Sequence, residues 1–234
     1  MTDSKSVIDN SFDFRSDAGG RDPDQHSPTL RMYHKVLWSK ELPDGHFFEL
    51  STDEPGHYLF HNSSRGQYTL ASDGMIPSYR NWKRAQGLIA LADEESVTEF
   101  QRLTYTIGGS IVFPRNRIDN RMTINGARGV AKAIADRFDL TLECIRRHYL
   151  GHISPLSGTL SNYKTFFDLF ETFDQYVEFF ALQDMVSGGQ VRHFLPFNDF
   201  VEAPIPATLK DYNYYMANAV EFLTKRGLRL ASSG

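Results

Sequence analysis

The hydrophobic period of this sequence changes from that of helices to that of strands and back, which limits the folds open to the chain. Over residues 47–70, the stretches FFELS, HYLFHNS and RGQYTLAS alternate in polarity and are separated by turn-forming residues. This alternation is typical of short antiparallel strands joined by tight turns. The flanking segments have helical spacing, and no regular order of strand, helix and strand follows. The sequence therefore predicts an α+β fold, mainly helical with a small antiparallel sheet.

Helical spacing is clearest in three segments outside this sheet. A Ser-Pro pair begins a helix expected over 28–39, because Ser is a good N-cap and Pro a good first helical residue. Helices are also expected over 129–138 and 208–226, the second followed by a frayed end. The short apolar stretches SIVF and VRHFLPF are expected to join the sheet as strands.

Length and composition favour one folded domain. The chain has 234 residues, of which 41% are apolar and 23% charged, close to the averages of globular proteins. Residues 1–27 are predicted to form an irregular N-terminal arm, because they are rich in Gly, Pro, Asp and Ser. The alternating Phe12 and Phe14 should dock part of this arm on the body. The remaining residues, 28–230, are expected to form a single α+β domain.

The sequence carries no feature of a membrane or secreted protein. No apolar run approaches the roughly 20 residues that span a bilayer, and the N-terminus lacks the apolar stretch of a secretory signal. Cys144 is the one cysteine, so it cannot form an internal disulfide. The absence of a disulfide framework fits a reducing compartment, and the cytoplasm is the expected location.

The chain is rich in aromatic residues, with 18 Phe, 11 Tyr and 2 Trp. Most of these rings are expected in the core, since apolar side chains are usually buried. The alternative is an exposed aromatic surface between residues 163 and 180, formed by Tyr163, Phe166, Phe167, Phe170, Phe173 and Tyr176. Because exposed apolar patches mark partner sites, this alternative describes a homodimer or a non-catalytic interaction protein of phage-defence or antitoxin type.

Positive charge is concentrated in one segment of this acidic protein, whose net charge is −4. Residues 100–150 carry nine basic side chains against four acidic ones, and eight of the nine are arginines. Arginine binds phosphate and carboxylate groups through two parallel hydrogen bonds. The segment therefore predicts either ion pairs with neighbouring acidic residues or a site for a phosphate-bearing ligand.

A phosphate site is the leading hypothesis for this segment. The glycines of residues 124–129 precede a helix, where backbone N–H groups can hold an anion. The expected ligand is a nucleotide or a single-stranded nucleic acid, since the rest of the chain is acidic and duplex binding needs a broad basic face. The proposed ligand-binding residues are Arg115, Arg117, Arg121, Asn125, Arg128, Arg137, Arg146 and Arg147.

Whether the protein is an enzyme stays open at this point. Asp119 and Asn125 would bind a ribose or a base, and Asp136 or His148 would transfer a proton if a reaction occurs. Arg147 and His152 also match the short Arg-x4-6-His pattern of the HEPN ribonucleases. In that chemistry, His moves a proton while Arg holds the scissile phosphate, normally across a dimer interface. An HEPN-like ribonuclease is therefore an alternative function.

Motifs of metal and cofactor sites are missing from the sequence. It contains no Walker loop, no GxGxxG, no paired CxxC and no HExxH. His57 and His61 would lie about 13 Å apart on one strand face, too far to chelate together. Gly151 is expected to end a helix between His148 and His152, which separates this pair as well. No metal and no cofactor are expected.

Four blocks of the sequence resemble an uncharacterised protein family. They are SPTLRMYHKVLWSKELPDG, TYTIGGSIVFPRNRIDNRMTINGARG, DRFDLTLECIRRHYLG and HFLPFNDF. They are similar to successive blocks of short bacterial proteins that share a domain of unknown function, and the resemblance covers about residues 9–225. It implies a compact bacterial cytosolic protein and brings no activity, cofactor or catalytic residue with it.

Overall fold

The computed structural model describes residues 8–52, 58–116, 122–201 and 205–233 and has the mixed α+β architecture that the sequence predicts. The helices are η1 (Phe14–Ser16), α1 (Pro23–His26), α2 (Pro28–Trp38), α3 (Lys83–Ile89), α4 (Glu94–Thr104), η2 (Ile107–Gly109), α5 (Ile124–Val130), α6 (Phe138–Tyr149), α7 (Ser157–Asn162), α8 (Lys164–Asp168), α9 (Phe173–Phe179), η3 (Gln183–Met185) and α10 (Leu209–Ser233). The strands are β1 (Lys40–Glu41), β2 (Phe47–Phe48), β3 (Ser51–Thr52), β4 (Leu59–Ser63), β5 (Gly66–Gly74), β6 (Ser110–Pro114), β7 (Val186–Ser187) and β8 (Gln190–Val191).

The main sheet is antiparallel and has the strand order β3-β4-β5-β6. The long strand β5 pairs with β4 as far as Leu70, which lies opposite Leu59. Its second half pairs with β6, where Ala71 lies opposite Phe113. The predicted strands of residues 47–70 and the strand SIVF are therefore confirmed, although Phe47 and Phe48 pair separately with β1.

The segment VRHFLPF does not join this sheet, so that prediction is wrong. Val191 pairs with Val186 in the small hairpin of β7 and β8. Gly188 and Gly189 form the turn of this hairpin with φ angles of 57° and 72°. Since glycine adopts positive φ at little cost, the turn lets the segment pair with its immediate neighbour.

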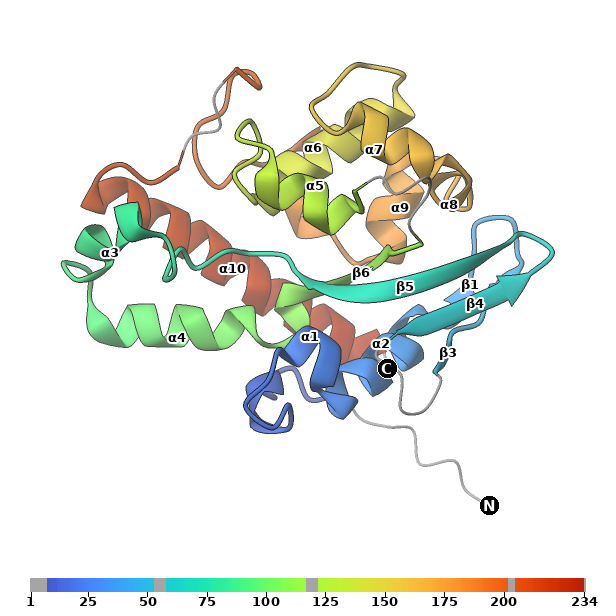
Figure 1. The fold of residues 1–234 in the computed structure, drawn as a ribbon, viewed down its shortest axis with the longest axis horizontal. Coiled ribbons are helices and arrows are strands. Elements are labelled where there is room, and N and C mark those ends of the chain that lie inside the picture. The colour runs from blue at the N-terminus through green and yellow to red at the C-terminus, as the bar shows by residue number, and fades with distance from the viewer. Residues whose placement is uncertain (1–7, 53–57, 117–121, 202–204, 234) are drawn as a thin grey trace.

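The helices form two layers on the main sheet (Figure 1). Helices α5 to α9 lie on one side of β5 and β6, and α1 and α2 lie on the other side. Helix α10 crosses the molecule and contacts α3, α4 and η2. Within the part of the chain that the structure describes, no helix has both the length and the apolar character that a membrane span requires.

Local capping explains where the helices begin. The Ser27 hydroxyl accepts a hydrogen bond from the Leu30 backbone N–H at 3.0 Å and starts α2 at Pro28, which confirms the prediction. The helix expected over 129–138 is wrong, because Thr123 caps α5 six residues earlier and the helix ends at Val130. It is followed by a turn in which Ala135 and Asp136 have left-handed φ angles of 50° and 60°.

The two ends of the described chain pack on the body. Residues 8–26 contain η1 and α1, and the buried Phe14 donates its backbone N–H to the carbonyl of Tyr105. Helix α10 continues to Ser233, so the frayed end expected after residue 226 is not observed. The reason is burial, because Leu230 is only 2% exposed.

Most of the described aromatic residues lie in the core, as expected. The rings of Phe170, Tyr176 and Phe180 contact one another at centroid distances of 4.9–5.4 Å. The six rings of the alternative partner surface are at most 7% exposed, so the alternative that they form an exposed surface is wrong and the expectation of a buried core holds for them. The reason is that α7, α8 and α9 direct their aromatic faces inward. These rings are Tyr163, Phe166, Phe167, Phe170, Phe173 and Tyr176.

Candidate functional site

Arg146 and Arg147 are held by one carboxylate on their own helix. Glu143 accepts from Arg146 at 2.8 Å and from Arg147 at 2.9 Å. Burial alone would raise the pKa of Glu143, but the hydrogen bonds from both guanidinium groups bring it below the usual value. The Arg147 guanidinium also lies over the Phe200 ring at 4.8 Å. Spacings of three and four residues on α6 explain these pairs.

Arg128 is buried at the centre of a polar network between α5 and β5. Its guanidinium pairs with the Asp73 and Asp136 carboxylates and donates to the carbonyls of Gly74 and Met75, both at 3.0 Å. A further hydrogen bond of 2.7 Å to the Asp136 carbonyl holds the left-handed turn. Arg128 therefore joins three segments of the fold and has little capacity left for a ligand.

Asp73 is the most perturbed carboxyl of this network. Burial raises the pKa of Asp73 to about 7. The negative charges of the nearby Asp24 and Asp136 raise this pKa further, and the positive charge of Arg128 offsets only part of the increase.

Arg137 forms a second buried ion pair at the start of α6. It is 0% exposed, as is its partner Asp139, which also accepts from the Phe194 backbone N–H at 3.0 Å. Burial works against ionisation of Asp139, yet hydrogen bonds from His193 and Arg137 leave its pKa below the usual value. The pair attaches α6 to the segment after β8.

Arg115 is placed differently from these four arginines. Its guanidinium lies over the Tyr58 ring at 4.6 Å, and among the described residues it forms no ion pair. Its backbone N–H donates to Thr69 at 2.7 Å, which fixes it beside β5. Arg117, Asp119 and Arg121, also predicted for this site, lie outside the described residues.

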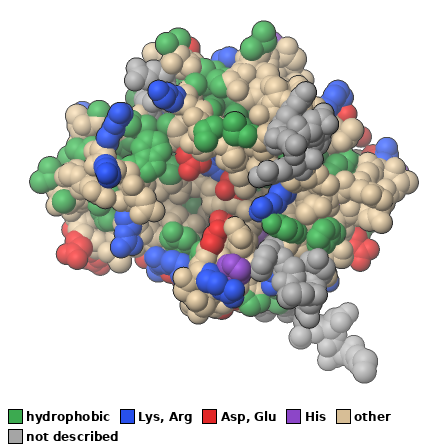
Figure 2. All heavy atoms as spheres, viewed as in Figure 1, with side chains coloured by type: hydrophobic (Ala, Val, Ile, Leu, Met, Phe, Trp, Pro, Cys, Tyr) green, Lys and Arg blue, Asp and Glu red, His purple; other side chains and the backbone are tan. Residues whose placement is uncertain are grey.

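Arg115 lines a polar cavity between α1, β5, β6 and α5. This β5 cavity has a volume of about 230 Å³. It is lined by Asp22, Asp24, Gln25, Tyr58, Ala71, Ser72, Asp73, Phe113, Pro114, Arg115, Thr123 and Asn125. Figure 2 shows acidic side chains gathered near the centre of this face of the molecule, where α1 and β5 meet in Figure 1. The predicted residues Arg115 and Asn125 thus share one cavity, with three carboxylates that the sequence analysis did not select.

A hydrogen-bonded array reaches this cavity from the core. The Trp38 indole N–H donates to His34 Nδ1 at 2.9 Å, and His34 Nε2 lies 2.9 Å from the Ser72 hydroxyl. The Ser72 hydroxyl in turn donates to Asp24 Oδ1 at 2.8 Å. Burial lowers the pKa of His34 to about 3, so the imidazole is neutral. No local motif connects these residues, because they come from α1, α2 and β5.

The residues predicted for proton transfer do not share a site. Asp136 precedes α6 and pairs with Arg128, whereas His148 lies in the last turn of α6 beside the Phe167 ring. The length of α6 separates them by about 18 Å at 1.5 Å per residue. His152 is exposed in the turn that follows, where its backbone N–H donates to the Arg147 carbonyl at 2.8 Å.

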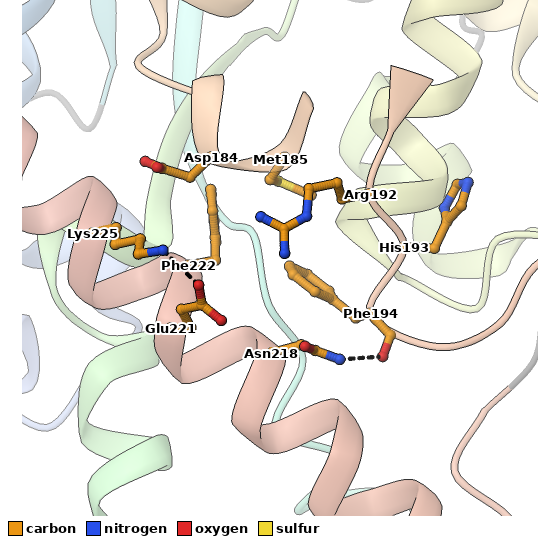
Figure 3. Close-up of a pocket in the computed structure, with 9 residues that line it drawn as sticks. All are labelled: Asp184, Met185, Arg192, His193, Phe194, Asn218, Glu221, Phe222 and Lys225. Carbon is orange, nitrogen blue, oxygen red and sulfur yellow. Dashed lines mark hydrogen bonds and ion pairs between the residues drawn. The ribbon is translucent and has the colours of Figure 1, made fainter. Parts of the chain in front are cut away.

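A second cavity lies between β8 and α10 (Figure 3). Arg192 extends over it while His193 points away, and Lys225 pairs with Glu221 at its margin. Its volume of about 30 Å³ is enough for roughly one water molecule and too small for a nucleotide. Of these two cavities, the β5 cavity is therefore the better candidate for a ligand site.

Metal binding is not indicated by the described side chains. Among residues 8–52, 58–116, 122–201 and 205–233, no three His, Cys, Asp or Glu side chains are grouped as metal ligands would be. In the β5 cavity, Asp24 instead accepts from Ser72, Asp73 pairs with Arg128, and Asp22 accepts from the Asp24 backbone N–H at the start of α1.

The structure thus defines a mixed α+β protein with a polar cavity at its central sheet. The chain belongs to a family of unknown function, DUF6994, whose model matches residues 8–230. This match includes the whole stretch of about residues 9–225 over which the sequence resembles such a family, so the resemblance is confirmed. No curated protein and no solved structure was found to match the chain.

Proposed function

We propose that the protein binds a small phosphate-bearing ligand, a nucleotide in preference to a nucleic-acid strand, in the β5 cavity. The observation that carries the proposal is the position of Arg115. Its guanidinium lies at the cavity wall over Tyr58, with its hydrogen-bonding edge not taken up by any described carboxylate. Guanidinium groups bind phosphate oxygens through charge-assisted hydrogen bonds, and a cation stacked on a ring keeps its N–H donors free.

The charges around Arg115 favour a small ligand over a strand. Asp22, Asp24 and Asp73 line the same cavity and would repel a continuous row of phosphates. Binding of a nucleic-acid strand normally needs several basic contacts along its backbone. Arg128, Arg137, Arg146 and Arg147 supply none of these if they keep their ion pairs.

Calorimetric titration with adenosine monophosphate in low salt tests the proposal. We expect the wild type to bind and Arg115→Gln to bind about tenfold or more weakly, since a hydrogen bond to a charged group contributes about 1.5–3 kcal/mol. Arg192→Gln is the matched control, because Arg192 is an exposed arginine at the cavity between β8 and α10, and this variant should bind like the wild type. Absence of binding by the wild type, or equal binding by Arg115→Gln, contradicts the proposal.

The HEPN-like ribonuclease is retained as a second candidate because of the surface around Arg147. Ile153 is 86% exposed and Val201 89% exposed, and Arg147 lies within reach of the Ile153 carbonyl and the Phe200 ring. An apolar surface beside an Arg and His pair is what a contact between two copies, or with another protein partner, would cover. Cleavage of single-stranded RNA by the wild type that His152→Ala abolishes would favour this candidate over a binding protein.

The cellular setting is part of the same proposal. We propose that the protein acts in a bacterial cytoplasm, which is supported by a single cysteine, Cys144, that lies buried in α6. Burial raises the pKa of this thiol to about 12, so it is a poor nucleophile and needs no oxidising environment.

A further inference from the structure

The β5 cavity has an acidic side as well as a basic one, and the two sides lie at different positions along the same strand. Arg115 is fixed beside Thr69 of β5, whereas Asp24 is bonded to Ser72. Three residues of a strand correspond to about 10 Å. The two residues are thus attached at different positions along β5, and a ligand that contacts both needs an anionic group for Arg115 and hydrogen-bond donors for Asp24.

In the hydrogen-bonded array from Trp38 to Asp24, the donor and the acceptor of each hydrogen bond are fixed. An indole N–H can only donate, so His34 Nδ1 must accept from Trp38. A neutral imidazole carries one donor and one acceptor, which leaves Nε2–H to donate to the Ser72 hydroxyl. Ser72 then directs its own proton to Asp24. This order rules out activation of Ser72 by His34, because Nε2 has no free lone pair.

Asp24 consequently faces the cavity as an oriented acceptor. Ser72 and the Gly74 backbone both hydrogen-bond to this carboxyl group, and a carboxylate has about four acceptor positions, so some are left for a ligand. Asn125, across the cavity on α5, adds a buried side-chain oxygen that has no hydrogen-bond partner among the described residues. A buried acceptor without a partner is costly, so the Asn125 oxygen calls for a ligand that donates a hydrogen bond.

We infer that the β5 cavity selects a phosphomonoester of a hydroxylated sugar, free or as part of a nucleoside monophosphate, and that Asp24 recognises its hydroxyl groups. The phosphate meets Arg115, and the sugar hydroxyls donate to Asp24 and Asn125. Ser72, His34 and Trp38 act as positioning residues that hold Asp24 in its accepting orientation. This inference deepens the proposed function and rests on it.

The inference is tested by comparing ribose 5-phosphate with inorganic phosphate in calorimetric titrations. We expect the wild type to prefer ribose 5-phosphate by about tenfold or more, and Asp24→Asn to lose most of this preference. Asn keeps the size of Asp but is a weaker acceptor, and it removes a negative charge that repels inorganic phosphate. The affinity for inorganic phosphate should therefore stay the same or rise. Asp174→Asn, an exposed residue on α9, is the control and should match the wild type.

Variants of Ser72 test the positioning role. Ser72→Ala should reduce the preference, and Ser72→Thr, which keeps the hydroxyl, should restore it. A general loss of structure would instead weaken the binding of both ligands to both variants. Adenosine monophosphate is the third ligand. If the wild type binds it more tightly than ribose 5-phosphate, the cavity is a nucleotide site. If the two affinities are equal, the cavity is a sugar-phosphate site.

The two proposals fail in different ways. If Asp24→Asn changes both affinities by the same factor while Arg115→Gln still weakens them, the inference is wrong and the phosphate site stands. If the wild type binds neither ligand, or Arg115→Gln has no effect, the proposed function is wrong and the inference falls with it.

Discussion

At the scale of single residues, buried arginines connect segments that are far apart in the sequence. Arg226 is 0% exposed and donates to the carbonyls of Ile107, Gly108, Ser110 and Phe180. Burial lowers the pKa of Arg226 to about 9. The nearby Tyr176 raises this pKa by less, so it does not offset the desolvation. Arg226 thus replaces the hydrogen bonds that these carbonyls lose when they are buried.

Replacement of this arginine should destabilise the protein strongly. We expect Arg226→Met to lower the free energy of unfolding by about 3–5 kcal/mol, since it leaves buried carbonyls without donors. Arg229 lies about one turn further along α10 and forms an exposed ion pair with Asp184. Arg229→Met removes only this pair and should lower the free energy of unfolding by less than about 1 kcal/mol. Urea denaturation of both variants measures the difference. Similar midpoints for the two would show that Arg226 has no special role.

Charge counting alone could not distinguish such structural arginines from ligand-binding ones. The basic segment is visible in the sequence, but its composition is compatible both with ion pairs and with a phosphate site. The i+3 and i+4 pairs of Glu143 with Arg146 and Arg147 were visible in the sequence. The pair of Arg128 and Asp73 was not, because 55 residues separate its members.

At the scale of elements, η2 and α10 meet through a close backbone contact at Gly108. A Cβ atom placed on Gly108 would collide with the backbone carbonyl of Leu223 and lie 3.2 Å from the backbone nitrogen of Gly227. Both obstacles are backbone atoms, so neither can move aside as a flexible side chain would. The absence of a side chain at Gly108 is therefore what lets α10 approach the start of β6.

This contact predicts opposite effects for two glycine substitutions. Gly108→Ala should destabilise the protein by about 1–3 kcal/mol, because overpacking forces the backbone apart. Gly129→Ala, on α5 with open space around it, should stabilise the protein by about 0.5–1 kcal/mol through helix propensity. Thermal unfolding of both variants checks the signs. A stable Gly108→Ala variant would mean that η2 and α10 are less tightly packed than the structure has them.

Elements with a strong local signal were predictable, and elements set by long-range contacts were not. The Ser27 cap and the alternation of β4 and β5 specify structure within a few residues, so they were predicted correctly. The turn at Ala135 and Asp136 depends on Arg128, and α10 is extended by burial of Leu230. In both cases a tertiary contact overrides the local pattern.

At the scale of the whole molecule, the β5 cavity is formed by four short segments that meet only in the folded chain. They come from α1, β5, the end of β6 and the start of α5, and Tyr58, the residue before β4, completes the lining. Arg115 and Asn125 could be selected from the sequence because both lie in the basic segment. Asp24, Ser72 and His34 could not, because their residue types are common and their spacing carries no motif.

The central claim is that this cavity holds a phosphorylated sugar between Arg115 and Asp24. A crystal structure of the protein grown with a saturating concentration of ribose 5-phosphate tests it most directly. We predict electron density in the β5 cavity, with phosphate oxygens within hydrogen-bond distance of the Arg115 guanidinium and a sugar hydroxyl on the Asp24 carboxylate. A cavity that holds only water at that concentration, or a ligand bound elsewhere such as beside Arg147, would contradict the account.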